Sequence, residues 1–125
     1  MPILSPKSLE RLDTCDTRLR RVIERAIKIV PEELDFTVLC GYRNEVDQER
    51  AFNTGVSRLK WPESRHNKQP AMAVDVVPFP IDWDDLNRLN RLASYIFRAA
   101  IIEKVDIEWG GHWPKFKDYP HWEIK

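Results

Sequence analysis

Hydrophobic residues recur at the spacing of an α-helix in two stretches of the chain, 16–30 and 81–104. The apolar positions are Leu19, Val22, Ile23, Ala26, Ile27 and Val30 in the first stretch, and Leu86, Leu89, Leu92, Ala93, Ile96, Phe97 and Ala100 in the second. Asp16 suits the N-cap of the first helix, and Pro31 ends it because proline cannot continue a helix. A third and more polar helix is expected over 44–55, where it is closed by a glycine.

Four shorter stretches have the character of β-strands: 34–41, 71–79, 106–109 and 121–125. In the second of these the side chains alternate, so that Asp75 lies on one face among alanine and valine residues. The order of helices and strands predicts an α+β fold with a small, mainly antiparallel sheet flanked by helices.

The length and charge of the chain exclude some classes of protein. At 125 residues without a repeat, linker or low-complexity tract, we expect one domain over 1–125. Twenty Lys and Arg balance twenty Asp and Glu, whereas a nucleic-acid-binding protein of this size usually shows a basic excess, so we expect no nucleic-acid partner. No apolar stretch approaches the roughly 18–20 residues that a membrane span needs, so membrane insertion is not expected.

The N-terminal segment MPILSPKSLERLD lacks the charged start, apolar run and small-residue cleavage site of a secretory signal peptide. We therefore expect synthesis in the cytoplasm, with release by another factor if the substrate lies outside. Cys15 and Cys40 are too few and too far apart for a zinc knuckle or a CxxC redox pair. The simplest interpretation is two small buried side chains, with a disulfide after release left open.

The residues that can carry chemistry gather in the second half of the chain. His66, His112 and His121 are its histidines, and the long, irregular loop 56–70 leads to the strand that carries Asp75. A carboxylate among apolar neighbours is costly to bury unless it is paired or bound to a metal ion. Two imidazoles and one carboxylate form a known catalytic zinc site. No HExxH motif, nucleophile elbow or phosphate-binding loop is present, so structural or exposed histidines remain the alternative interpretation.

The segments SRH (64–66) and AVD (73–75) resemble the S-x-H…A-x-D motif of the M15 zinc peptidases, which include D-alanyl-D-alanine dipeptidases and carboxypeptidases and the phage L-alanyl-D-glutamate endolysins. Further similar segments are GYR at 41–43 followed by Gln48, WGG at 109–111, and DYPHWE at 118–123. The resemblance covers residues 5 to 125, and the pattern SRHN…AVDVVPFPIDW is most similar to the phage lysis enzymes.

This resemblance implies a fold like that of hedgehog and D-Ala-D-Ala peptidases, with one Zn²⁺ per chain held by His66, Asp75 and His121 and a water molecule in the fourth position. Such a zinc ion lowers the pKa of its water to about 7. Asp118 would take the proton and pass it to the leaving amine, with Glu123 as the alternative. Taken alone, Asp118 is also an ordinary turn residue.

The same resemblance gives Arg43 the task of polarising the scissile carbonyl or binding a substrate carboxylate, which suits its forked donors. Gln48 and Ser64 are further candidates for substrate contacts. Taken alone, Arg43 could instead form a surface ion pair with Glu45 or Asp47, and Ser64 could only cap its loop.

Two departures from the family pattern concern the site. Eight residues separate its first histidine from the aspartate, more than the family usually has, and we expect the segment NKQPAM (67–72) to bulge and form one wall of the substrate cleft. His112 stands where the family typically has aspartate, at a position that is not a ligand. Trp61 and Trp113 are expected in the loops around the cleft.

The leading functional hypothesis is a phage endolysin, a monomeric zinc peptidase that cuts the L-Ala–D-Glu bond in the peptide stem of peptidoglycan. The alternatives are a D-Ala-D-Ala carboxypeptidase or dipeptidase, and a non-catalytic wall-binding module on the same fold.

Overall fold

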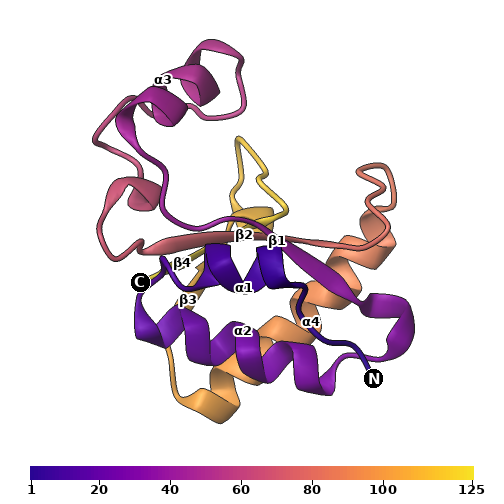
Figure 1. The fold of residues 1–125 in the computed structure, drawn as a ribbon. Coiled ribbons are helices and arrows are strands. Elements are labelled where there is room, and N and C mark those ends of the chain that lie inside the picture. Colours follow the sequence, from indigo (N-terminus) through magenta and orange to yellow (C-terminus); the bar gives the residue numbers. More distant parts are fainter.

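The computed structural model describes residues 1–125 and is built around one four-stranded sheet (Figure 1). The strands are β1 (Phe36–Cys40), β2 (Ala73–Pro78), β3 (Ile107–Trp109) and β4 (His121–Ile124). They lie in the order β1-β2-β4-β3, and every neighbouring pair is antiparallel. The prediction of an α+β fold with a small antiparallel sheet is confirmed.

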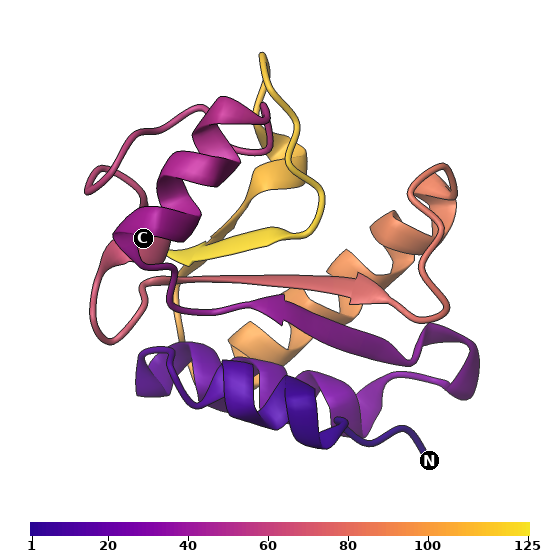
Figure 2. The ribbon, with the colours of Figure 1, turned by 45° about the horizontal axis from the view of Figure 1, so that its top comes forward.

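Four α-helices surround this sheet: α1 (Pro6–Leu12), α2 (Thr17–Ile29), α3 (Glu45–Asn53) and α4 (Leu86–Glu103). Three short 3₁₀ turns complete the structure: η1 (Glu32–Leu34), η2 (Arg65–Asn67) and η3 (Gly110–His112). Helix α2 packs on α4, α1 packs on β1, and these three helices lie on one side of the sheet, while α3 lies on the other (Figures 1 and 2). No helix is long and apolar enough to cross a membrane.

The helix boundaries follow the local capping chemistry. The Asp16 side chain accepts a hydrogen bond from the amide of Arg18, which confirms it as the N-cap of α2. Helix α3 ends just before Gly55, whose φ of 81° provides the left-handed turn expected of a closing glycine. Helix α4 begins at Leu86 rather than near 81, because Asp85 caps it and the preceding aspartates form a turn. Helix α1, capped by Ser5, was not predicted, since seven residues carry too little periodicity.

The strands β2 and β4 each divide their side chains between a core face and a functional face. Val74 and Val76 of β2, like Trp122 and Ile124 of β4, belong to the hydrophobic core that the helices cover. The Trp122 indole stacks on Trp109 at a centroid distance of 5.6 Å, a pairing worth about 0.5–1.5 kcal/mol beyond burial. Because side chains alternate along a strand, this anchored core face holds the residues between them on the opposite face.

Candidate active site

Asp75 and His121 are brought together by strand register. They are directly opposed residues of the antiparallel pair β2–β4, so their side chains leave the sheet on the same face. His121 Nδ1 lies 3.4 Å from Asp75 Oδ1. The two predicted ligands that are distant in sequence are thus neighbours because of the sheet.

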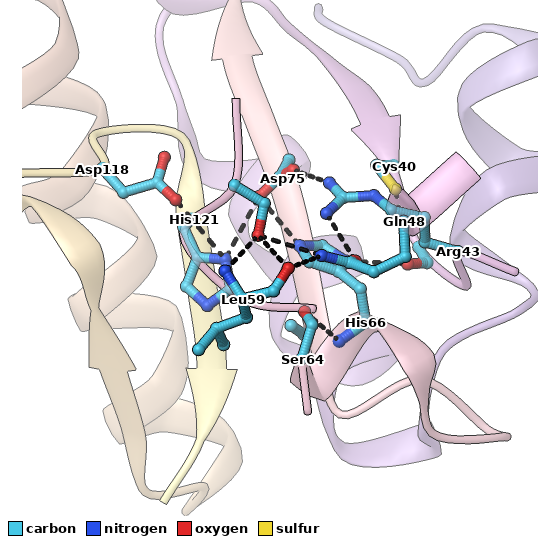
Figure 3. Close-up of polar contacts among 12 residues, drawn as sticks. Cys40, Arg43, Gln48, Leu59, Ser64, His66, Asp75, Asp118 and His121 are labelled. Atoms are coloured by element: carbon cyan, nitrogen blue, oxygen red, sulfur yellow. Dashed lines mark hydrogen bonds and ion pairs between the residues drawn. The ribbon is translucent and has the colours of Figure 1, made fainter. Parts of the chain in front are cut away.

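His66 reaches the same carboxylate from the turn η2, just before β2 (Figure 3). Its Nε2 lies 3.2 Å from Asp75 Oδ1. The turn is closed by a capping box, in which the Ser64 hydroxyl accepts from the His66 amide at 3.2 Å and the Asn67 side chain accepts from the Ser64 amide at 3.1 Å. The amide of Arg43 also donates to the His66 carbonyl oxygen at 2.8 Å, which ties the turn to the end of β1.

The outer nitrogen of each imidazole is held by an acceptor. His66 Nδ1 donates to the Gly41 carbonyl oxygen at 2.8 Å, and His121 Nε2 donates to Glu123 Oε1 at 2.8 Å. A carbonyl oxygen or carboxylate can only accept, so the outer nitrogens carry protons, and the inner nitrogens that face Asp75 are the ones that can bind a metal ion once they lose theirs. Histidine ligands of metal ions are usually fixed in this way through their second nitrogen.

Both inner nitrogens lie at a distance from Asp75 Oδ1 that suits neighbouring ligands of a tetrahedral ion. Zinc bonds of about 2.0–2.1 Å at tetrahedral angles put neighbouring ligand atoms about 3.3 Å apart. The two distances to Asp75 Oδ1 are 3.2 Å from His66 and 3.4 Å from His121. The nitrogen and oxygen donors and these two distances are compatible with a tetrahedral metal ion such as Zn²⁺.

The three groups are also strongly coupled by charge. Burial alone would lower the pKa of His66, but the Asp75 carboxylate outweighs it and raises that pKa to about 10. Burial alone would raise the pKa of Asp75, yet His66 and His121 hold it well below its usual range. Without a metal ion the site is held together as a carboxylate between two basic rings, so metal binding must release protons from the histidines.

A second possible donor lies at the edge of this group. Cys40 faces Asp75 across β1–β2, and Cys40, His66 and Asp75 offer three donor atoms that all lie within 4.8 Å of one another. The strand bulges at this point, so that Leu39 is displaced towards the cleft. Both cysteines are free thiols, Cys15 buried and Cys40 half-buried.

Arg43 is bound within the site rather than on the surface. Its Nη2 lies 3.5 Å from Asp75 Oδ2, and its Nη1 donates to Gln48 Oε1 at 3.0 Å. The side chain is only 12% exposed. The alternative of a surface ion pair with Glu45 or Asp47 is therefore wrong.

Gln48 is a fully buried junction in the hydrogen-bond network, with 0% of its surface exposed. Besides Arg43, its Oε1 accepts from Asn67 Nδ2 at 3.0 Å. Its Nε2 donates to the Leu59 carbonyl oxygen at 2.7 Å and to the Ser57 hydroxyl at 3.0 Å (Figure 3). Since it does not line the cleft, the predicted direct contact between Gln48 and substrate does not fit its burial.

The two candidate bases differ in how their oxygens are used. Asp118 Oδ2 lies 3.9 Å from His121 Nδ1, and its side chain is 28% exposed. Burial and the nearby charge of Asp75 raise the pKa of Asp118. Glu123 uses one oxygen to accept from His121 and the other, at 3.0 Å, to pair with Arg65 Nε. Burial opposes ionisation of Glu123, but the hydrogen bond to His121 keeps its pKa below the ordinary value.

These groups open into a cleft of about 550 Å³. Its walls come from loop 56–65 and from the segment 113–121, with Trp83 at the rim. Trp113 lines the cleft as predicted and packs 5.1 Å from the His121 ring. Trp61 does not, because it lies in a separate groove beside α3.

The predicted role of NKQPAM (67–72) as a cleft wall is wrong. None of its residues lines the cleft. After Asn67 the segment turns away and Ala71 joins the N-terminal part of the chain, donating to the Thr14 carbonyl oxygen at 2.9 Å and accepting from the Asp16 amide at 2.9 Å. Three exposed residues, 68–70, span between these two anchored points.

His112 is a packing residue that lies outside the ligand group. Its ring stacks on Phe97 at a centroid distance of 5.5 Å and meets Trp109 edge-on at 4.9 Å. Among the cleft residues that sequence reasoning missed are Leu39, Arg58, Trp83 and Phe116, which stand in loops or at a bulge and belong to no spacing pattern.

Comparison with known proteins gives consistent matches. The family model described as phage L-alanyl-D-glutamate peptidase matches residues 3–125. The chain is 30% identical over 103 residues to the peptidoglycan L-alanyl-D-glutamate endopeptidase CwlK of Bacillus subtilis. This match covers 73% of the chain and 61% of CwlK, so the chain spans less than two thirds of the length of that relative. The crystal structure of the Serratia marcescens L-Ala D-Glu endopeptidase ChiX is similar with a TM-score of 0.80 and 32% identity, covering 98% of this chain and 90% of that one.

Proposed function

The chain belongs to the phage L-alanyl-D-glutamate peptidase family, and on this basis we propose that it is a zinc-dependent endopeptidase that hydrolyses the L-Ala–D-Glu bond of peptidoglycan. One observation carries the zinc part of this proposal: two imidazole nitrogens meet on one oxygen of Asp75 while their outer nitrogens are fixed by Gly41 and Glu123. The description of the family and the functions named for the two relatives support the choice of bond.

One zinc ion would be held by His66 Nε2, Asp75 Oδ1 and His121 Nδ1. Bound zinc supplies the activation of a water molecule at neutral pH and the polarisation of a carbonyl oxygen. Arg43 holds the second oxygen of Asp75, and Glu123 orients the His121 ring. We favour His121 over Cys40 as the third ligand because its nitrogen contacts the same Asp75 oxygen that His66 contacts.

Asp118 would act as the general base and acid. Its Oδ2 faces His121 on the cleft side and has no hydrogen-bond donor of its own, so it is free to accept the proton of the attacking water. Because its pKa is raised, the protonated carboxyl can then return that proton to the leaving amine nitrogen. Glu123 is less suited, since both of its oxygens already bind His121 and Arg65.

The remaining predicted residues would position the site. Arg43 keeps donors beyond those it uses on Asp75 and Gln48, which can bind the scissile carbonyl or a substrate carboxylate. Gln48 would act through Arg43 and loop 56–65 rather than by touching substrate, and Ser64 would act as the cap of the His66 turn.

The test combines metal analysis with product identification. Purified protein should contain one zinc per chain, and mass spectrometry of fragments released from sacculi should show new N-terminal D-glutamate. His66→Ala and His121→Ala should lose metal and activity together, while Cys40→Ser and His112→Ala serve as matched controls that keep both. Retention of zinc by His121→Ala with loss in Cys40→Ser would show that the cysteine is the third ligand. Release of D-alanine instead would favour the carboxypeptidase alternative.

We further propose that the protein acts as a phage endolysin and as a monomer. The phage family description supports the first point. Light scattering after size-exclusion chromatography tests the second.

A further inference from the structure

Three arginines line the cleft, and they differ in their partners. Arg43 is paired with Asp75, and Arg65 is paired with Glu123 at 3.0 Å. Arg58 has no carboxylate within ion-pair distance. Its guanidinium carbon instead lies 4.3 Å from the centroid of the Phe116 ring. The cleft therefore contains one arginine whose charge is not balanced by the protein.

The backbone around Arg58 is fixed relative to the zinc ligands. The residues on either side of it are held by the buried Gln48, which donates to the Ser57 hydroxyl at 3.0 Å and to the Leu59 carbonyl oxygen at 2.7 Å. The Leu59 amide also donates to the Ser57 hydroxyl at 3.1 Å, which closes a tight turn at Arg58. The same Gln48 accepts from Arg43, so one buried side chain connects the Arg58 turn with the partner of Asp75.

The stack on Phe116 orients the guanidinium without using its donors. An aromatic ring attracts the flat face of a guanidinium, so its N–H edge stays available for a planar, bidentate partner such as a carboxylate. Phe116 stands two residues before Asp118, on the wall that also carries Trp113. The contact therefore spans two loops and places the guanidinium on the same side of the cleft as the proposed base.

The proposed substrate has a matching group. Glutamate has two carboxyl groups, and the peptide chain beyond it uses only one of them. Every L-Ala–D-Glu substrate that continues past the glutamate thus carries a carboxyl group within the first residue after the scissile bond, charged at neutral pH unless it is amidated. We propose that Arg58, held on Phe116, binds this free carboxylate and makes the enzyme selective for the unamidated stem. This inference rests on the proposed function and deepens it by naming a specificity-determining residue.

The test compares two synthetic stem peptides containing the L-Ala–D-Glu bond, one with the free glutamate carboxylate and one with that group converted to its amide. The contact combines an exposed ion pair with a charge-assisted hydrogen bond, for which a preference of about tenfold is expected. Wild-type protein should cut the carboxylate peptide with a kcat/KM about tenfold higher, mainly through KM. Arg58→Gln should remove this preference by slowing only the carboxylate peptide.

Arg98→Gln is the matched control. Arg98 also stacks on an aromatic ring, with its guanidinium carbon 4.9 Å from the Tyr95 centroid, but it lies on α4 outside the cleft. The Arg98→Gln variant should leave the kcat/KM for both peptides unchanged. Equal wild-type rates on the two peptides, or an equal loss on both in Arg58→Gln, would overturn the role of Arg58 and leave the proposed function standing. Failure of the wild-type protein to cut either peptide would overturn the proposed function, and this inference with it.

Discussion

Two carboxylates flank His121, and the roles proposed for them lead to opposite kinetic consequences. Glu123 Oε1 accepts a short bond of 2.8 Å from the outer nitrogen of the ring, whereas Asp118 Oδ2 stands 3.9 Å from its inner nitrogen. The first contact should govern how well the protein holds zinc, and the second how fast the chemistry proceeds. Conversion of each carboxylate to its amide, one at a time, separates these effects.

The expected magnitudes follow from what each substitution removes. Glu123→Gln keeps an acceptor oxygen for His121 but loses the charge, and second-sphere changes of this kind typically cost about 10- to 100-fold in metal affinity. We expect the lower end for Gln and the upper end for Glu123→Ala, which also removes the acceptor for His121; both changes remove the carboxylate partner of Arg65. Asp118→Asn should change zinc affinity little and lower kcat by about 10²–10⁴-fold, because an amide cannot accept and return the proton.

The assay is a zinc titration against a competing chelator, followed by initial rates of fragment release from sacculi at saturating zinc. Under those conditions Glu123→Gln should recover most of the wild-type kcat, and Asp118→Asn should not. If Glu123→Gln stays inactive with zinc bound while Asp118→Asn is near wild type, the two roles must be exchanged. Loss of kcat without loss of zinc in both variants would refute the assignment of Glu123 as an orienting group.

Three further predictions concern residues around the site. Gln48→Ala should lower the free energy of unfolding by about 2–4 kcal/mol in urea titrations, since it leaves several buried hydrogen-bond partners unsatisfied. A loss below about 1 kcal/mol would contradict the role of Gln48 as a junction. Because burial raises the pKa of Cys15 to about 12, a thiol reagent at pH 8 should label Cys40 first and Cys15 only on unfolding; equal native rates would argue against this burial. The double variant Lys68→Ala, Gln69→Ala should keep zinc and activity, because both side chains are exposed and lie outside the cleft. A loss of activity would indicate that this segment does form part of the cleft wall.

The elements and the ligand group were accessible to sequence reasoning for different physical reasons. Helix α2 and strand β2 can be predicted because burial of one face requires hydrophobic residues at a regular spacing in the sequence. The meeting of Asp75 with His121 is not implied by periodicity, since it needs the pairing and register of β2 with β4. Only the resemblance to a family with known spacing connected these two residues. Helix α1 was missed for the opposite reason, because a short capped turn leaves almost no pattern.

Which of the two loops beside His66 borders the cleft could not be predicted from the sequence. His66 lies between two irregular segments, 56–65 and 67–72, and either one could in principle border the cleft. The choice is made by partners far away in sequence: Gln48 of α3 holds the first segment at the cleft, while Thr14 and Asp16 hold the second against the N-terminal helices.

Nothing within the two segments encodes that difference, because both are polar and proline-containing and the deciding atoms are backbone carbonyls and amides. Arg58 illustrates the consequence. Its side chain looks like an ordinary exposed loop arginine in the sequence, and its place over Phe116 depends on the Gln48 bonds to its neighbours. Specificity in this fold should therefore change more readily than catalysis. The proposed zinc ligands are fixed by register and capping, whereas the cleft walls depend on a few side-chain-to-backbone bonds that single substitutions can move.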